Sequence, residues 1–222
     1  MMQGKLIVME GIDGSGKSTQ YKLLCQRLEA QGTDFRRLVF PRYSEPSSAL
    51  IRMYLGGEFG AKPGDVGPYA ASTFYAVDRY ASYKTQWKDY YTSGGVLLSD
   101  RYTTSNAVHQ GAKLPEEERK NYLEWLYDFE FRLLELPKPD LVLYMDVDLE
   151  TSLRQMRARE KATNTTGDIH ETDAEYLRTC LSAGQFAADH YGWQRIRCAE
   201  NGVMRSIEDI HEDIYAAVKG VF

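Results

Sequence analysis

A glycine-rich segment near the start of the chain constrains its fold more than any other feature. Residues 11–19, Gly-Ile-Asp-Gly-Ser-Gly-Lys-Ser-Thr, match the pattern G-x-x-x-x-G-K-[ST] at every fixed position. An apolar run at residues 6–9 precedes the segment, and a stretch of helical character at residues 17–30 follows it. Between a strand and a helix, such glycines let backbone N–H groups point at phosphate oxygens. This context favours a nucleoside triphosphate site over a chance match.

Individual positions in this loop have separate expected roles. We expect the Lys17 ammonium to reach the β- and γ-phosphates and the Ser18 hydroxyl to ligate Mg²⁺. The motif by itself indicates triphosphate binding and does not identify a reaction. The predicted ATP-binding residues are Gly11, Asp13, Gly14, Ser15, Gly16, Lys17, Ser18 and Thr19.

Strand-length apolar runs alternate with longer helical stretches along the chain. We expect strands near residues 6–9, 37–40, 96–98, 141–145 and 194–198. We expect helices at residues 17–30, 69–90, 116–136, 149–161, 174–191 and 206–218. This alternation is typical of βαβ units with a buried parallel sheet. The sequence therefore predicts an α/β fold, a P-loop three-layer α/β/α sandwich with a five-stranded parallel sheet and helices on both faces, in a single domain spanning residues 1–222.

The composition excludes several classes of function. Hydrophobic residues make up 43% and charged residues 27%, the balance of a soluble globular protein, and the net charge of −5 argues against a nucleic-acid partner. No apolar stretch approaches the roughly 18–20 residues needed to cross a bilayer, which argues against a membrane partner. The three cysteines lack C-x-x-C spacing and suit a reducing compartment. Since the N-terminus has no signal-peptide pattern, we expect a cytoplasmic protein.

An acid and an arginine follow the third expected strand. Asp100 lies at the carboxyl end of that strand, where ligands bind in parallel sheets and where a carboxylate can hold a hydrated Mg²⁺. Arg101 beside it can hold a phosphate through paired N–H donors. A surface ion pair is the alternative, and the position directly after a buried strand favours a site. We predict Ser18 and Asp100 as the metal ligands.

Four segments give the chain a resemblance to a known family. They are residues 11–19, the run Phe-Pro-Arg at 40–42, the run Tyr-Ala-Val-Asp-Arg at 75–79, and the run Asp-Arg-Tyr-Thr-Thr-Ser-Asn-Ala at 100–107. On these segments, and in the order of strands and helices, the chain resembles the thymidylate kinases, which are P-loop nucleoside-monophosphate kinases. The resemblance implies transfer of the γ-phosphoryl group of ATP to dTMP, giving dTDP and ADP, with Mg²⁺. It also implies a homodimer.

The resemblance further assigns residues to the sugar and phosphate of the acceptor. Asp13 would contact the deoxyribose 3′-hydroxyl and help to place the metal. Arg101 would hold the acceptor phosphate, and Arg42 would assist, although the family's arginine often lies one residue later, where this chain has Tyr43. His109 stands where many bacterial members have a tyrosine, which leaves discrimination against a 2′-hydroxyl open.

The same resemblance assigns residues to the thymine base. Tyr75 would stack on the ring, with Phe74 as the alternative stacking residue, Arg79 would bond a thymine carbonyl, and Asn106 would meet the N3 edge. Taken alone, Tyr75 and Arg79 are four residues apart and also fit an ordinary amphipathic helix. The predicted dTMP-binding residues are Asp13, Arg42, Tyr75, Arg79, Arg101, Ser105 and Asn106.

Phosphoryl transfer also needs positive charge at the moving group. Members of the family place an arginine inside the loop or supply basic residues from a lid. Because this loop has no arginine, we expect a lid at about residues 154–173, with Arg157 and Arg159 closing over ATP; a solvated basic helix face is the alternative. On this view a Gly14→Arg variant would partly rescue the loss of a lid arginine. The predicted catalytic residues are Lys17, Asp13, Arg101, Arg157 and Arg159.

Several other functions remain open at this point. A kinase for another deoxynucleotide or for a deoxynucleoside would use the same loop, and so would a non-catalytic nucleotide-binding protein. The arginines at positions 42 and 101 favour an acceptor that already carries a phosphate. A small GTPase is disfavoured because the chain lacks the Asn-Lys-x-Asp motif that reads guanine.

Overall fold

Five parallel strands form the central sheet of the computed structural model, which describes residues 4–163 and 174–221. The spatial order is β2-β3-β1-β4-β5, and all four neighbouring pairs are parallel. The strands are β1 (Lys5–Glu10), β2 (Arg36–Val39), β3 (Val96–Asp100), β4 (Leu141–Asp146) and β5 (Gln194–Arg197). Central β1 pairs on both sides, Ile7 lying opposite Leu98 and Leu141. The four residues of β1 from Leu6 to Met9 are fully buried, which explains their continuous apolar run.

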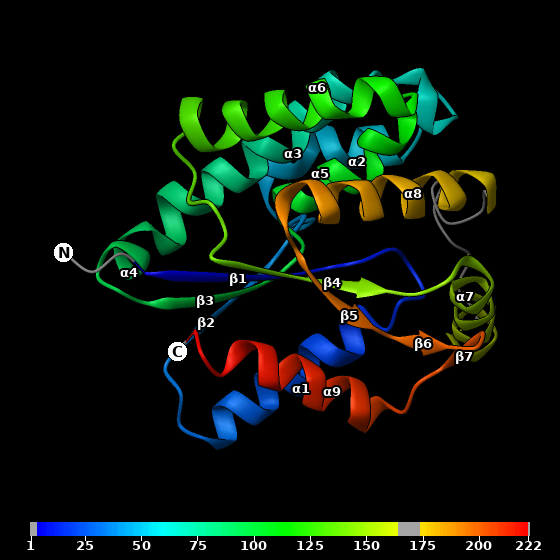
Figure 1. The fold of residues 1–222 in the computed structure, drawn as a ribbon. Helices are drawn as coiled ribbons and strands as arrows, with labels where there is room; N and C mark the ends of the chain where they lie inside the picture. Colours follow the sequence, from blue (N-terminus) through cyan, green and yellow to red (C-terminus); the bar gives the residue numbers. More distant parts are fainter. Residues whose placement is uncertain (1–3, 164–173, 222) are drawn as a thin grey trace.

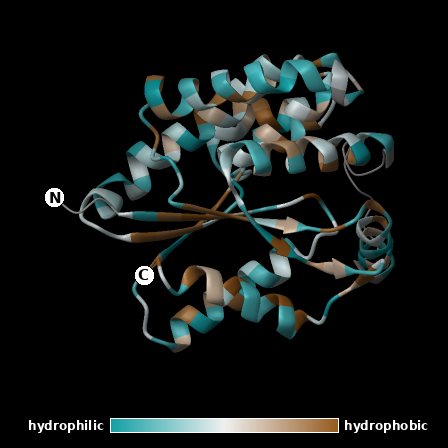
Figure 2. Ribbon diagram, viewed as in Figure 1, coloured by the Kyte–Doolittle hydropathy of each residue, from teal (hydrophilic) through white to brown (hydrophobic). Residues whose placement is uncertain are grey.

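Helices cover both faces of this sheet (Figure 1). On one face, α1 packs beside α9; on the other, α3, α5, α6 and α8 form a thicker layer. Figure 2 shows the apolar strands enclosed between the two helical layers. The expected three-layer sandwich with a five-stranded parallel sheet is therefore confirmed. The helices are α1 (Lys17–Ala30), α2 (Ala49–Leu55), α3 (Pro68–Ser82), α4 (Lys88–Thr92), α5 (Thr103–His109), α6 (Glu116–Tyr127), α7 (Leu149–Thr163), α8 (Ala174–Tyr191) and α9 (Ile207–Val218).

Two of the long helices expected from the sequence contain wider π-helical turns. The stretch expected at residues 69–90 runs from α3 through a π-helical turn at Tyr83–Trp87 into α4, and α6 continues into a second such turn at Asp128–Leu133. In the first turn, the rings of Tyr83 and Trp87 are buried with centroids 4.7 Å apart. Such turns rotate the faces of a helix relative to a regular α-helix, so aromatic burial here outweighs regular backbone geometry.

Short elements account for the remaining differences. Helices α2 and α5 have seven residues each, too short to be stable by propensity alone, and the sequence did not predict them. Helix α5 is held by packing against α8. A small antiparallel hairpin, β6 (Ala199–Glu200) with β7 (Val203–Met204), also follows β5 unpredicted. These elements form through contacts that are distant in sequence.

Cys25, Cys180 and Cys198 are buried and form no disulfide. Within residues 4–163 and 174–221, none of the helices combines the length and apolar character that crossing a membrane requires.

Candidate active site

The glycine-rich loop connects β1 to α1, as the sequence predicts. Gly16 caps α1 with φ of 83°, and Gly14 has φ of 75°, a left-handed conformation that favours glycine. A Cβ atom at Gly14 would lie 2.3 Å from the backbone oxygen of Ser152 at the start of α7. The structure thus leaves no room for a side chain at this position. The rescue of a lost lid arginine by Gly14→Arg stays a prediction, and it would require α7, which packs directly on the loop, to move.

A pocket lies over the loop and extends to α7. Ser15 in its wall is 1% exposed, and its Oγ has no hydrogen-bond partner among the described residues. Buried hydroxyls are normally paired, so this atom can donate a hydrogen bond to a polar group in the pocket or accept one from it. Gln155 contributes to the wall and was not identified from the sequence. The lining residues are Ile12, Asp13, Gly14, Ser15, Gly16, Lys17, Ser18, Thr19, Gln155 and Arg159. Gly11 is outside this wall and donates its N–H to the Glu10 carboxylate at 2.9 Å.

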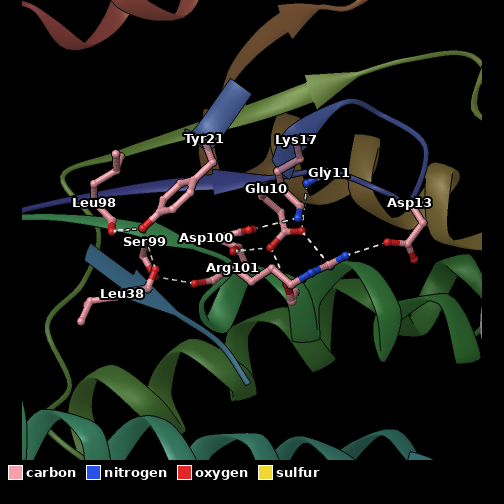
Figure 3. A network of polar contacts seen from close by, with 12 residues as sticks. Glu10, Gly11, Asp13, Lys17, Tyr21, Leu38, Leu98, Ser99, Asp100 and Arg101 are labelled. Carbon is pink, nitrogen blue, oxygen red and sulfur yellow. Dashed lines mark hydrogen bonds and ion pairs between the residues drawn. The ribbon is translucent and has the colours of Figure 1, made fainter. Parts of the chain in front are cut away.

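Lys17 and Asp100 form an ion pair beneath the loop (Figure 3). The distance between Lys17 Nζ and Asp100 Oδ1 is 2.8 Å, and the side chains are 7% and 15% exposed. Burial, and then the nearby Arg101 guanidinium, lower the pKa of the Lys17 ammonium, while Asp100 opposes the shift. The sequence predicted both residues, but not that they pair with each other. The pair holds the Lys17 ammonium in the wall of the loop pocket.

Arg101 is the centre of a second charged network (Figure 3). One guanidinium nitrogen donates to Asp13 Oδ1 at 2.9 Å, and the other lies 3.5 Å from Glu10 Oε1. Burial would raise the pKa of the Asp13 carboxyl, but the surrounding positive charges, that of Arg101 foremost, leave it lowered. Burial would likewise lower the pKa of Arg101, but Asp13 and Glu10 raise it. Asp13 is thus held ionised against the Arg101 cation.

Glu10 supports this network and was not identified from the sequence. Its carboxylate is fully buried and accepts hydrogen bonds from the Thr104 hydroxyl at 2.7 Å and the Ser105 hydroxyl at 2.6 Å. Ser105, which the sequence predicts to bind the acceptor nucleotide, therefore also donates a hydrogen bond to Glu10. The available signal was an acid ending an otherwise apolar strand directly before the loop, where burial requires partners.

A second pocket lies on the other side of Asp13. Six of the seven residues predicted to bind the acceptor lie in its wall, and only Arg42 does not: the six are Asp13, Tyr75, Arg79, Arg101, Ser105 and Asn106. The complete wall consists of Asp13, Phe40, Pro41, Tyr43, Leu55, Tyr75, Arg79, Arg101, Tyr102, Ser105, Asn106, His109 and Gln110. Because Asp13 lines this pocket and the loop pocket, the two cavities adjoin at one carboxylate. The sequence did not identify Phe40, Leu55, Tyr102 or Gln110 as part of it.

Arg79 enters this wall with most of its guanidinium already engaged. It is 1% exposed and donates to both oxygens of the buried Glu130, with Nε 2.7 Å from Oε2. Burial would lower its pKa, and Glu130 raises it. Glu130 was not identified from the sequence because it lies in the π-helical turn after α6, far along the chain. Such a pairing fixes the direction of the arginine.

The structure separates the two candidates for ring stacking. Tyr75 lines the pocket, whereas Phe74 packs against Tyr54 and Phe59, with ring centroids 6.4 Å and 5.7 Å apart. Asn106 also lies in the wall, and its amide nitrogen donates to the Ser72 carbonyl at 3.2 Å. That bond fixes which way the amide group faces.

Arg42 lies outside the walls of both pockets described here. Its Nε donates to Asp78 Oδ1 at 3.2 Å and its backbone N–H to Asp78 Oδ2 at 2.9 Å. Asp78 is 1% exposed and therefore needs a cationic partner. The neighbouring Tyr43 faces the pocket in its place. The sequence could not predict this exchange, because Asp78 lies on α3, more than thirty residues further along the chain.

The two arginines expected from the lid differ in position. Arg159 on α7 lines the loop pocket and is near enough to Asp13 to contribute to the lowering of its carboxyl pKa. Arg157 is exposed, as Arg159 is, but it is not part of that wall. Helix α7 covers the first part of the expected lid, and residues 164–173 of that segment lie outside the described residues.

The oxygen donors available for a metal are few. No cluster of three or more His, Cys, Asp or Glu side chains suited to a metal occurs in the described part of the chain. Ser18 lies in the wall of the loop pocket, and the Asp100 carboxylate lies below it, paired with Lys17. One hydroxyl and one carboxylate suit Mg²⁺, which keeps several waters and takes other ligands from nucleotide phosphates. The residues present therefore fit this ion.

A parallel sheet with a phosphate-binding loop and two adjoining pockets at the carboxyl ends of its strands defines a P-loop protein of the nucleotide kinase type. The sequence profile of the thymidylate kinases matches residues 9–214. The thymidylate kinase of Mycobacterium tuberculosis is 34% identical over 190 residues, covering 84% of this chain and 87% of the relative. A protein of Pyrococcus abyssi named "Probable thymidylate kinase" is 32% identical, covering 98% of this chain and 97% of the relative.

Structural comparison agrees on the fold. The thymidylate kinase of Candida albicans superposes with a TM-score of 0.72 at 21% identity, covering 99% of this chain and 92% of the other. The chain belongs to the thymidylate kinase family. It is accordingly an enzyme of the nucleoside-monophosphate kinase group, and the resemblance inferred from the four sequence segments is confirmed.

Proposed function

We propose that this protein transfers the γ-phosphoryl group of ATP to dTMP, giving dTDP and ADP. The observation that carries the proposal is the position of Asp13 and Arg101 between two pockets. Asp13 lines the loop pocket and the second pocket, and Arg101 donates to it at 2.9 Å. A donor and an acceptor seated in these pockets would meet at this ion pair, and positioning is most of what phosphoryl transfer requires.

The loop pocket would hold the donor. The unpaired Ser15 Oγ and the backbone N–H groups of residues 11–19 would bind its phosphates, and the positive end of α1 would favour them. Lys17 would exchange its contact with Asp100 for a bond to the β- and γ-phosphates. Ser18 and Asp100 would hold Mg²⁺, which supplies charge neutralisation at the phosphates when bound. Arg159, in the pocket wall, would add positive charge at the moving group.

The second pocket would hold the acceptor. Its wall pairs aromatic side chains with a few fixed polar groups, an arrangement suited to a nucleobase. Tyr75 would stack on the thymine ring, while Arg79, fixed by Glu130, would bond a carbonyl and Asn106 would meet the N3 edge. Arg101 would hold the acceptor phosphate, with Ser105 beside it. Arg42 would contribute only if it left Asp78.

A coupled assay of ADP release tests the proposal. ATP and Mg²⁺ are supplied with dTMP, dUMP, other monophosphates or thymidine as acceptor. We expect dTMP to stimulate ADP release and thymidine not to stimulate it, because Arg101 would bind the phosphate that thymidine lacks. Stimulation by thymidine alone would indicate a deoxynucleoside kinase, and stimulation by another monophosphate would reassign the acceptor. Failure of every acceptor would leave a non-catalytic nucleotide-binding protein and overturn the proposal.

We also propose a cytoplasmic homodimer, as is common in the family. Three apolar or aromatic side chains along α3 support a self-association surface: Tyr69, Val77 and Tyr80 are 44%, 51% and 38% exposed. Spacings of eight and three residues place them along one stripe of the helix. Sedimentation or light scattering of the purified protein gives its mass in solution.

A further inference from the structure

The imidazole of His109 lies between Arg101 and Cys180. Its Nε2 is 3.0 Å from a terminal nitrogen, Nη1, of Arg101, and its Nδ1 is 3.6 Å from the sulfur of Cys180 on α8. The same Arg101 nitrogen lies 3.3 Å from the Ser105 hydroxyl. His109 ends α5 and lines the second pocket, so it contacts the guanidinium from the pocket side.

This geometry fixes the proton on the ring. A guanidinium can only donate hydrogen bonds, so Nε2 must accept and carry no proton. The neutral imidazole then has its proton on Nδ1, directed at the Cys180 sulfur. Burial raises the pKa of the Cys180 thiol to about 12, so the sulfur is an uncharged, weak acceptor at neutral pH. The arrangement seen here therefore requires the neutral ring with Nδ1 protonated.

Charged groups surround this ring on several sides. Arg101 carries a positive charge directly against it, and Lys17 lies further along the loop. Asp13 is near enough for the charge of His109 to act on its carboxyl, and Glu10 lies beyond Arg101. On α8, the Tyr176 hydroxyl donates to the His109 carbonyl at 2.8 Å. The carboxylates thus favour a protonated ring, but a second N–H would face the guanidinium and break its hydrogen bond.

We infer that His109 is a positioning residue for Arg101, whose neutral Nε2 holds one arm of the guanidinium so that the remaining N–H groups face the acceptor phosphate. The inference rests on the proposed function. The other side-chain contacts of Arg101 described above are with the carboxylates of Glu10 and Asp13 and the hydroxyl of Ser105. His109 is the contact that can lose its role as a hydrogen-bond acceptor by taking up a proton. Protonation of His109 at Nε2 releases that arm of the guanidinium, and binding of the acceptor nucleotide weakens as a result.

Two substitutions separate this role from simple packing. In His109→Gln, the side-chain oxygen can reach the position of Nε2 and accept the same hydrogen bond, but it does not titrate. In His109→Leu, the volume is largely kept and the acceptor is lost. Steady-state kinetics give kcat and the apparent KM for dTMP and for ATP between pH 5.5 and 8.5. Ionisation of the dTMP phosphate affects all variants equally and cancels from ratios between them.

We expect the wild-type KM for dTMP, divided by that of His109→Gln, to rise about tenfold as the pH falls from 8.5 to 5.5 and the imidazole takes up a second proton. The Leu variant should show a raised KM for dTMP at every pH, at a constant ratio to the Gln variant. The KM for ATP should have the same pH profile in all three. Thermal unfolding identifies any variant that has lost its fold. His190→Gln, a change at an exposed histidine on α8, should keep the wild-type profile.

A ratio of wild-type to Gln KM that does not change with pH would overturn the inference. A ¹⁵N NMR spectrum of the imidazole at pH 8 provides an independent test, in which protonated Nδ1 and unprotonated Nε2 are expected. The opposite tautomer would also overturn it. Failure of dTMP to stimulate ADP release from the wild-type protein is a different result, and it would overturn the proposed function instead.

Discussion

At the scale of single residues, the candidate site is organised by buried and partly buried carboxylates that hold cations in place. Glu10 and Asp13 hold Arg101, Glu130 holds Arg79, and Asp100 holds Lys17. A buried charge is costly without a partner, and a paired one fixes the direction of the partner's remaining donors. Arginines held in this way need little reorganisation when an anionic ligand arrives, whereas Lys17 would have to exchange Asp100 for the ligand.

Glu10 gives the sharpest test of this arrangement. In Glu10→Ala, the Thr104 and Ser105 hydroxyls and the Gly11 N–H lose their acceptor, and Arg101 loses one carboxylate. We expect the free energy of unfolding to fall by about 3 kcal/mol, measured by denaturant titration. Glu29→Ala is the control, since Glu29 forms an exposed ion pair with Arg37, and it should cost less than about 1 kcal/mol. Equal losses in the two variants would contradict the prediction.

At the scale of elements, the loop and α7 together form the wall of the loop pocket. Helix α7 packs on the loop so closely that Gly14 contacts the Ser152 carbonyl region, and it also brings Arg159 and Gln155 into the pocket wall. The second pocket has its own support, because Lys113, just after α5, donates hydrogen bonds to α2 and to the segment before α3. Both pockets therefore depend on contacts between elements that are distant in sequence.

Two glycines with similar backbone angles isolate the packing of α7 on the loop. Gly14 and Gly32 have φ of 75° and 70°, but a Cβ atom clashes with Ser152 only at Gly14 and meets nothing within 4 Å at Gly32. Gly32→Ala should lower the free energy of unfolding by about 1–2 kcal/mol through backbone strain alone. Gly14→Ala should cost more and weaken ATP binding at least tenfold, as measured by calorimetry. Retained ATP affinity in Gly14→Ala would contradict the prediction, because it would show that α7 moves aside to accommodate the Cβ atom.

The arginines of α7 form a second matched pair. Arg159→Gln should lower kcat at least tenfold while changing ATP affinity little, because its charge would act mainly on the moving phosphoryl group. Arg157→Gln should have a much smaller effect, since Arg157 lies outside the pocket wall. Pre-steady-state rates and ATP titrations measure both quantities. An unchanged kcat in both variants would remove the proposed role of these arginines.

Lys113 predicts a dependence of stability on pH. Its Nζ donates to the Tyr54 hydroxyl and the Val66 carbonyl, each at 2.8 Å, and burial lowers its pKa from 10.5 to about 8. Between pH 8 and 9.5 the unfolded chain keeps a proton that the folded chain has released. The free energy of unfolding should therefore rise with pH in this range, by less than about 1.4 kcal/mol per unit because the side chain is partly exposed.

A variant without the amine isolates this contribution. Lys113→Met removes the titrating group while keeping a long apolar stem, and other ionisable residues contribute equally to both proteins. The unfolding free energy of the wild type minus that of the variant, measured by denaturant titration at each pH, should increase as the pH rises from 8 to 9.5. A difference that stays constant or shrinks would contradict the lowered pKa.

At the scale of the whole molecule, one sheet brings both pockets to the same edge. Strands β1 and β3 are parallel neighbours, so the loop after β1 and the Asp100–Arg101 pair after β3 emerge side by side. The thick helical layer above the sheet (Figure 1) supplies much of the wall of the second pocket, and α3 in this layer carries the exposed stripe of Tyr69, Val77 and Tyr80. Covering that stripe with a second copy would remove apolar surface from water.

The proposed dimer can be tested on this stripe. We expect Val77→Asp to convert the dimer to a monomer, because a carboxylate buried at an apolar interface lacks a partner. Val203→Asp is the control, since Val203 is 67% exposed on β7, away from α3, and should leave the mass unchanged. Light scattering over a range of concentrations gives the result. A dimer that persists in Val77→Asp would move the interface elsewhere.

The sequence by itself determined the sheet, the loop and the family. These features follow from local properties of the chain. Its apolar runs are long enough for buried strands, and its loop motif has glycines at positions that other residues do not readily occupy. The tertiary structure decided which charges pair. Lys17 with Asp100, Arg79 with Glu130, and Arg42 with Asp78 each join residues more than thirty positions apart. Buried charges take whichever partner the fold brings near, and no local pattern encodes that choice.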